Sequence, residues 1–143
     1  MRQREELIET IDRQVARDNL YKSGIRPVVT LEDFFVDNED VASIGCNLSD
    51  HPGVQRFYQI LSDVRARDDV FDVLVGITEI VDRESDGCWP FSDEIYVITT
   101  AAPEMVNSWL KELQPDEAFP ITPKRANLPE SKAPYQTLVV WWD

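Results

Sequence analysis

Residues 70–81 read VFDVLVGITEIV and residues 94–100 read EIYVITT, and these two stretches decide the fold. Both are rich in β-branched and aromatic residues, and their apolar side chains recur at every second position, as is typical of β-strands. The twelve residues between them, DRESDGCWPFSD, are mostly polar and turn-forming. We therefore predict a hairpin of two antiparallel strands. Within the first strand, Phe71, Val73 and Val75 are expected to share one face.

Helical periodicity flanks this hairpin on both sides, because apolar residues recur there at three- and four-residue spacing. These patterns predict helices over residues 3–22, 31–35, 52–66 and 103–113. The second of these helices follows a capping-box pattern, in which Thr30 precedes Asp33 by three positions. The N-terminal helix, within residues 1–24, has a thin apolar stripe, so it needs a partner surface to be stable.

Two further strands complete the predicted sheet, one over residues 42–47 and one over residues 137–142. The order from residue 42 is then β-α-β-β-α-β, which is the order of ferredoxin-like domains. We predict one α+β domain over residues 1–143, with a mainly antiparallel four-stranded sheet and helices packed on it. Residues 114–135 hold five of the nine prolines and are expected to form a loop.

Both faces of this sheet are predicted to be apolar. Trp141 and Trp142 are consecutive, so they point to opposite faces of the last strand. Tyr96 and Val97 divide in the same way on the strand paired with the first. A large open apolar face requires a cover. We expect the N-terminal helix to cover the second face, and a partner protein is the alternative.

The chain is strongly acidic, and its charge is unevenly distributed. It has 27 acidic and 14 basic side chains, a net charge of −13 over 143 residues. Residues 30–94 alone carry 16 acidic and 4 basic side chains, a net charge of −12. This argues against binding to nucleic acid or to anionic membranes, both of which need basic surfaces. It favours a basic protein partner, because complementary charge speeds association, although solubility alone also explains an acidic surface.

The sequence carries no membrane or export signal that we can identify. It contains no run of 18 apolar residues, and its first ten residues, MRQREELIET, lack the apolar core of a secretory signal. Cys46 and Cys88 form no CxxC pattern and are expected to be reduced thiols. These features favour a cytoplasmic protein.

The candidate partner-binding residues lie in the acidic hairpin loop. An aromatic cluster rimmed by carboxylates is typical of a protein-binding hot spot. We predict that the partner-binding site consists of Asp82, Glu84, Asp86, Trp89, Phe91 and Asp93. The alternative for the aromatic residues is a loop anchor that tucks under the end of the sheet.

The same loop has the spacing of a weak candidate calcium site. Asp82, Glu84 and Asp86 stand at positions 1, 3 and 5 of an EF-hand-like pattern, and Asp93 stands at position 12. However, Asp93 replaces the usual bidentate glutamate, and Pro90 interrupts the loop. An acidic hairpin loop without metal is therefore the favoured interpretation.

No motif in the sequence predicts catalysis. The single histidine, His51, lies five residues after Cys46, but a helix-capping role explains it more simply than a thiolate nucleophile. We predict no cofactor and favour a non-enzymatic binding protein. A small-ligand domain or an enzyme with a carboxylate cluster is the alternative, and a homodimer through the N-terminal helix or the Trp141/Trp142 edge stays open.

Two stretches resemble a known group of proteins. They are LEDFFVDNEDVASIGCNL with the HPG at 51–53, and WPFSDEIYVIT with the helix that ends near Leu113. Together they resemble small acidic bacterial proteins of unknown function, over about Val29 to Glu117 and the VVWWD end. The small, acidic α+β character is also similar in kind to toxin-immunity proteins of the SUKH superfamily. An immunity or inhibitor protein is the concrete form of the binding role that this likeness implies.

Overall fold

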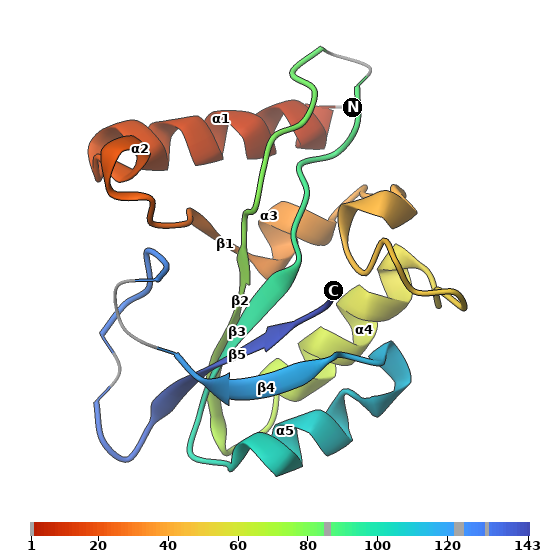
Figure 1. The fold of residues 1–143 in the computed structure, drawn as a ribbon, viewed down its shortest axis with the longest axis vertical. Helices are drawn as coiled ribbons and strands as arrows, with labels where there is room; N and C mark the ends of the chain where they lie inside the picture. Colours follow the sequence, from red (N-terminus) through yellow and green to blue (C-terminus); the bar gives the residue numbers. More distant parts are fainter. Residues whose placement is uncertain (1, 85–86, 122–124, 131) are drawn as a thin grey trace.

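Five antiparallel strands form the centre of the fold (Figure 1), and the computed structural model describes residues 2–84, 87–121, 125–130 and 132–143. Their spatial order is β1-β2-β3-β5-β4. The strands are β1 (Val28–Thr30), β2 (Val70–Gly76), β3 (Glu94–Thr99), β4 (Glu117–Pro120) and β5 (Gln136–Trp141). The predicted α+β class with an antiparallel sheet is confirmed.

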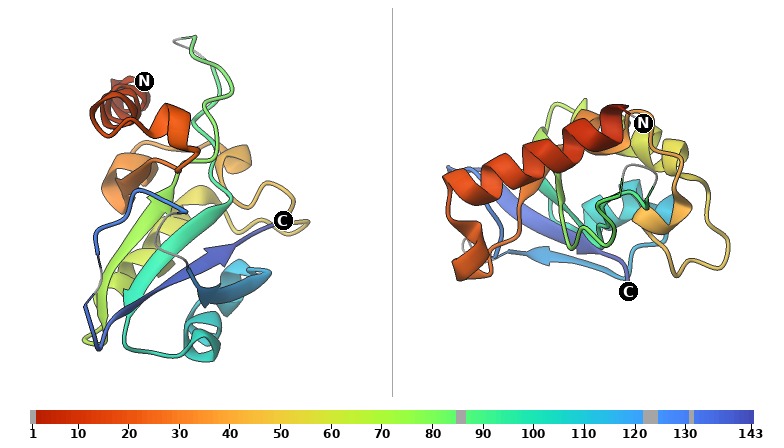
Figure 2. Two further views of the ribbon diagram at one scale, coloured as in Figure 1. Left: turned by 60° about the vertical axis from the view of Figure 1, so that its left-hand side comes forward. Right: turned by 90° about the horizontal axis from the view of Figure 1, so that it is seen from above.

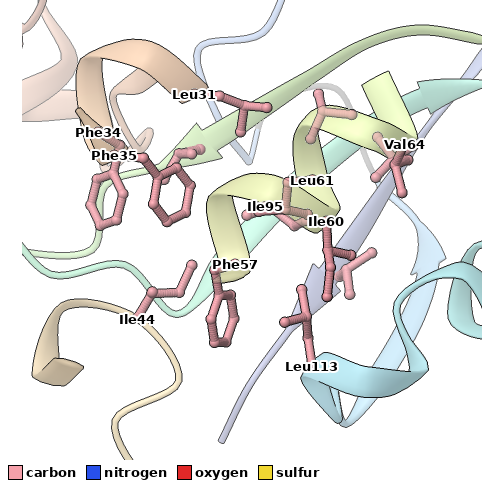
Figure 3. Close-up of a cluster of buried hydrophobic side chains, with 14 of the residues drawn as sticks. Leu31, Phe34, Phe35, Ile44, Phe57, Ile60, Leu61, Val64, Ile95 and Leu113 are labelled. Atoms are coloured by element: carbon pink, nitrogen blue, oxygen red, sulfur yellow. The ribbon is translucent and has the colours of Figure 1, made fainter. Parts of the chain in front are cut away.

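Helices cover one face of this sheet and one of its ends. They are α1 (Arg2–Arg17), α2 (Leu20–Ser23), α3 (Leu31–Phe35), α4 (Val54–Arg65) and α5 (Pro103–Trp109), with 3₁₀ turns η1 (Val41–Ser43) and η2 (Lys111–Leu113). The main core lies between α3, α4 and the sheet, where Phe34, Phe57 and Ile95 are fully buried (Figure 3). The apolar periodicity of α4 thus faces the sheet as predicted.

The predicted hairpin is confirmed, with Val75 opposite Ile95 and Gly76 opposite Glu94. One detail of it is wrong. The register shifts between Val70 and Asp72, so Phe71 does not join the core face. Its ring is exposed and lies 5.7 Å from that of Tyr135, centroid to centroid. A β-bulge inserts one extra residue and so changes which face the neighbouring side chain meets.

The predicted strand over residues 42–47 is wrong, and with it the ferredoxin-like order. Residues Val41–Ser43 form the turn η1, and Ile44 makes only an isolated bridge to Ser92. The side chain of Asp40 accepts from the Ala42 N–H and so starts a turn at this point. The first strand is instead β1, which is only three residues long.

The second face of the sheet is not covered by the N-terminal helix. It is covered by the proline-rich segment, from which Ala126, Leu128 and Tyr135 pack against Tyr96 and Val139. The same segment contributes β4, the fifth strand that the sequence pattern did not predict. Pro120, which ends the strand, and Pro123 made this stretch look like a loop, because proline fits only at strand edges and ends.

The N-terminal helix lies across one end of the sheet (Figure 2). It is shorter than predicted, because Asn19 adopts a left-handed conformation, φ 52°, and separates α1 from α2. Leu7 and Ile11 join the main core. The amide of Gln14 donates to the Val28 carbonyl at 2.7 Å and accepts from its N–H at 2.9 Å. Gln14 therefore occupies backbone groups that an edge strand would otherwise expose.

Two features bear on membrane insertion and on thiol oxidation, namely the character of the helices and the state of the two cysteines. Among the described residues, no helix has the length and apolar character needed to cross a membrane. Cys46 and Cys88 are both exposed, and neither is in a disulfide.

Candidate functional site

The outer part of the loop between β2 and β3 is held against α1 (Figure 1). Nε of Arg4 donates to the Cys88 carbonyl at 3.0 Å, and its Nη2 donates to the carbonyl of Asp82. Arg83 pairs with Asp12 of α1, with an Nη1–Oδ2 distance of 2.8 Å. The carboxylates of Asp82 and Glu84 therefore lie at the far end of the loop, whereas Asp86 lies outside the described residues.

Trp89 is a loop anchor and not part of an exposed site. Its side chain is 7% exposed, and its Nε1 donates to the Phe34 carbonyl at 2.9 Å. The ring belongs to the main core. The structure therefore favours the loop-anchor alternative over the hot spot for Trp89, because the buried indole N–H already has an internal acceptor.

The outer loop and two other segments carry partly or fully exposed carboxylates, and hydrogen bonds hold these segments near one another. The Trp89 N–H donates to Oδ2 of Asp40 at 3.1 Å, which ties the loop to the segment after α3. Nε2 of Gln3 donates to the Asp33 carbonyl at 3.4 Å, which ties α1 to α3. We call this surface the acidic end. It consists of Asp33, Val36, Asp37, Glu39, Asp40, Val41, Val81, Asp82 and Glu84.

Three apolar side chains are exposed within the acidic end. Val36, Val41 and Val81 are 37%, 53% and 62% exposed. Each is adjacent in sequence to a carboxylate of the same surface. An apolar patch rimmed by charge is typical of a surface that meets another protein.

Among the described residues, the carboxylates of the acidic end form no ion pair, and Arg83, which lies between Asp82 and Glu84 in sequence, pairs with Asp12 instead. Eight arginines of the described residues form ion pairs with carboxylates of the same chain. At one such pair, the Arg65 guanidinium hydrogen-bonds Glu32 and lowers the pKa of that carboxyl. Within the part of the chain that the structure describes, none of these pairs includes a carboxylate of the acidic end.

Phe91 and Asp93 lie at the base of the hairpin loop, where they line a pocket of about 250 Å³. We call it the hairpin-base pocket. Its lining consists of Gly45, Cys46, Asn47, Phe91, Ser92, Asp93, Trp141, Trp142 and Asp143. Besides Trp89 in the core, the described residues predicted to bind a partner are thus divided between the acidic end and this pocket. The bridge from Glu79 to Phe91 marks the point where the loop leaves the sheet.

The ring of His51 hydrogen-bonds the backbone beside this pocket and is not placed as a base for Cys46. The Gly53 N–H donates to Nδ1 of His51 at 2.9 Å, so Nε2 carries the proton and donates to the Ile44 carbonyl at 2.7 Å. Both ring nitrogens are therefore used to fold the backbone next to Gly45. This arrangement leaves no imidazole nitrogen to activate the thiol.

A buried ion cluster lies beside the pocket. Glu94 is 1% exposed, and its carboxylate accepts from Arg125 at 2.8 Å and from the Tyr96 hydroxyl at 2.5 Å. Arg26 lies 3.1 Å from Glu94 and donates to Oδ1 of Asp93 at 2.6 Å. Two partly exposed arginines and the partly exposed Asp93 thus surround one buried carboxylate, that of Glu94, and the charges balance.

Gly76 has no side chain, and this leaves the space that the Tyr96 hydroxyl occupies in the cluster. A Cβ on Gly76 would collide with that hydroxyl, and Gly76 stands directly opposite Glu94 in the sheet. The sequence carried one signal for the cluster that our prediction did not use. Glu94 occupies an inward position in the same alternation as Tyr96, and a buried carboxylate requires a cationic partner.

The weak candidate calcium pattern of the loop is not assembled by its described residues, and its fourth residue, Asp86, lies outside them. Asp93 is held at the loop base by Arg26, and Oγ1 of Thr78 donates to it at 2.9 Å. Asp82 instead accepts from the Glu84 N–H at 2.9 Å, within the outer loop. No group of three or more histidine, cysteine, aspartate or glutamate side chains among the described residues is placed to hold a metal ion.

A second groove, between α4 and α5, has no excess charge. Its volume is about 310 Å³. Arg56 pairs with Glu112 across it, and the Arg67 guanidinium lies 3.9 Å from the centre of the Trp109 ring. Because the charged groups balance one another, this groove offers no preference for a basic or an acidic partner.

Tyr96 makes the cluster sensitive to alkaline pH. Burial, and then the hydrogen bond to Glu94, raise the pKa of Tyr96 above its ordinary value of about 10. The unfolded chain ionises this phenol near pH 10 while the folded chain keeps it neutral, so stability falls as pH rises above about 10. Tyr96→Phe is expected to make this fall shallower. Urea unfolding at a series of alkaline pH values measures it, and equal slopes for both proteins would contradict the assignment.

Comparison with known proteins places this chain among uncharacterized ones. A family model described as "Uncharacterized protein YfbO family" matches residues 2–140. A protein of Escherichia coli (strain K12), described as "Uncharacterized protein YfbO", is 46% identical over 95 residues, which are 66% of this chain and 65% of that relative. The match therefore spans less than two thirds of the relative's length. No solved structure matches the chain. The predicted resemblance to bacterial proteins of unknown function agrees with these matches.

Proposed function

This chain belongs to the YfbO family of uncharacterized proteins, and we propose that it binds a basic protein partner through the acidic end. The observation that carries the proposal is the coincidence of unpaired carboxylates and exposed valines on one surface. Val36, Val41 and Val81 are exposed there, and none of the ion pairs among the described residues includes one of the surrounding carboxylates.

The negative charge of the acidic end favours a basic protein as the partner. A concentrated negative field steers a positively charged partner and raises its association rate. Like charges held together on one surface repel one another, and a basic partner relieves that repulsion. The exposed valines add apolar contact at the centre of the charged rim.

The concrete form of this role is an immunity-type or other inhibitor protein. Such a protein acts by covering its target, so it needs no catalytic group of its own. The use of both nitrogens of His51 for folding is in keeping with this role. The class-level likeness to SUKH-type immunity proteins supports the same direction. In this form, the bound partner is expected to lose its own activity.

The proposal is tested by affinity capture from a lysate of the source cell with two matched variants. One variant neutralises the acidic end by Asp37→Asn, Glu39→Gln, Asp82→Asn and Glu84→Gln. The control removes the same charge from exposed residues elsewhere, by Asp63→Asn, Asp68→Asn, Glu104→Gln and Glu130→Gln. Asp40 is left unchanged, because it caps η1 and holds the Trp89 N–H.

A basic protein that the wild type and the control retain at low salt is expected, with release at high salt because screening weakens the attraction. The acidic-end variant is expected to bind it roughly tenfold or more weakly, mainly through slower association. Equal capture by both variants contradicts the acidic end as the docking surface. Retention only of acidic or neutral proteins contradicts the charge argument.

A further inference from the structure

We propose that the hairpin-base pocket is a separate binding site for an organic cation of the guanidinium or alkylammonium class. The proposal does not depend on the partner proposed for the acidic end. It rests on the charge, the aromatic walls and the size of the pocket, which together select one ligand chemistry.

The charge of the lining is negative only. Asp93 and Asp143 line the pocket, and no lysine or arginine of the described residues does. Arg26 neutralises Asp93, so the excess negative charge comes from the side of Trp141. There the Asp116 N–H donates to the Trp141 carbonyl at 2.9 Å, and Glu117 stands opposite Trp141 in the sheet.

Two of the residues that line the pocket are aromatic and only partly buried. They are Phe91 and Trp141. A cation next to an aromatic face is attracted by the ring quadrupole, and guanidinium and ammonium groups benefit most. A neutral ligand of the same shape gains only apolar contact at these walls.

The walls are fixed before any ligand arrives. The Ser92 N–H donates to the Ser43 carbonyl at 2.8 Å, and the Trp142 N–H donates to the Asp93 carbonyl at 2.9 Å. Nε1 of Trp142 donates to the Leu113 carbonyl at 2.8 Å, and this hydrogen bond holds the Trp142 side chain in the core. A site built in advance loses little conformational freedom on binding.

The size of the pocket limits the ligand. About 250 Å³ is below the range of roughly 300–1,000 Å³ that drug-sized ligands occupy. The pocket therefore accepts one cationic head group with a short alkyl arm. Both a free metabolite and an arginine or lysine side chain of a partner present this chemistry.

The test is an NMR titration of the full chain with n-butylguanidinium and n-butylammonium. Saturable shifts at Gly45, Ser92 and the Trp141 indole are expected, with a Kd on the order of 1 mM, as suits so small a ligand. n-Butanol and butyrate have a similar shape without the positive charge, and neither is expected to saturate. Equal binding of n-butanol, or shifts that map elsewhere, would overturn the proposal.

Variants locate the cation within the pocket. Trp141→Leu is expected to weaken n-butylguanidinium binding about tenfold, and Asp143→Asn, on the exposed edge, about threefold. Trp109→Leu, in the groove between α4 and α5, is the matched control and is expected to leave Kd unchanged. If Trp141→Leu does not fold, Phe91→Leu takes its place. Unchanged affinity in both pocket variants overturns the assignment.

A competition experiment with the wild-type chain identifies the source of the cation and needs no substitution in the acidic end. Displacement of n-butylguanidinium by a captured partner assigns the pocket to a partner side chain, and simultaneous binding assigns it to a free ligand. The pocket variants keep the acidic end intact, and the acidic-end variant keeps the pocket intact. Failure of this proposal is thus distinguishable from failure of the proposed function.

Discussion

Glu94→Gln is expected to lower the free energy of unfolding by about 3 kcal/mol, the lower end of the usual cost of breaking a buried ion pair, because Arg26 and Arg125 keep partial contact with solvent. Glu94 is 1% exposed and accepts from Arg125 and from Tyr96, and its Oε1 lies 3.1 Å from Nη1 of Arg26. Glutamine keeps the size of the side chain but loses the charge that balances the two arginines. Urea unfolding followed by tryptophan fluorescence measures the change.

An exposed ion pair of the same residue types provides the control. Glu32 pairs with Arg65, but half of its side chain is exposed. Glu32→Gln is therefore expected to cost less than about 1 kcal/mol, because solvent screens surface pairs. A loss for Glu94→Gln that is no larger than the loss for Glu32→Gln would mean that the cluster does not stabilise this end of the sheet.

Trp89→Ala is expected to lower the free energy of unfolding by a similar amount, about 3–5 kcal/mol. The substitution removes a large ring from the main core and leaves a cavity that neighbouring side chains fill only partly. It also removes the Nε1 donor of the Phe34 carbonyl, which is buried. Thermal or urea unfolding measures the change directly.

Trp89→Phe separates this role from a role in binding. Phenylalanine keeps most of the apolar contact and loses the hydrogen bond, so we expect a smaller loss of about 1–2 kcal/mol. The folded Trp89→Phe protein is expected to bind the partner as tightly as the wild type. A hot-spot tryptophan would instead cost 2 kcal/mol or more in binding, and such a loss would restore Trp89 to the docking surface.

Elements with strong local signals could be predicted from the sequence. The hairpin of β2 and β3 alternates over at least six residues in each strand, and α4 keeps its apolar stripe over three turns. The short helix α3 has its own start signal, since Oγ1 of Thr30 accepts from the Asp33 N–H at 3.0 Å. In each case the local preference and the tertiary environment favour the same structure.

Elements that depend on distant residues could not be predicted in this way. The strands β1 and β4 contain only three and four residues, too few for an alternating pattern to stand out. The cover of the second face comes from a proline-rich segment whose apolar residues have no regular spacing. Composition marks such a segment as a loop but does not tell which surface the loop covers.

The residues predicted to form one site are separated in the structure, because residues of one loop lie in three different environments. Trp89 enters the core, Phe91 and Asp93 line the hairpin-base pocket, and Asp82 and Glu84 remain at the acidic end. A tryptophan in a polar loop has the same sequence pattern whether it is an anchor or a binding residue. Only its neighbours in space decide, here the Phe34 carbonyl and the main core.

The most direct test of the central claim is a hydrogen-exchange footprint of the chain, measured alone and in complex with the captured basic protein. Our account predicts slower amide exchange at residues 36–41 and 81–84, the segments that supply most of the acidic end. Exchange in α4 and α5 is expected to stay unchanged. Protection confined to α4 and α5, with residues 36–41 and 81–84 unaffected, would contradict the claim that the acidic end is the docking surface.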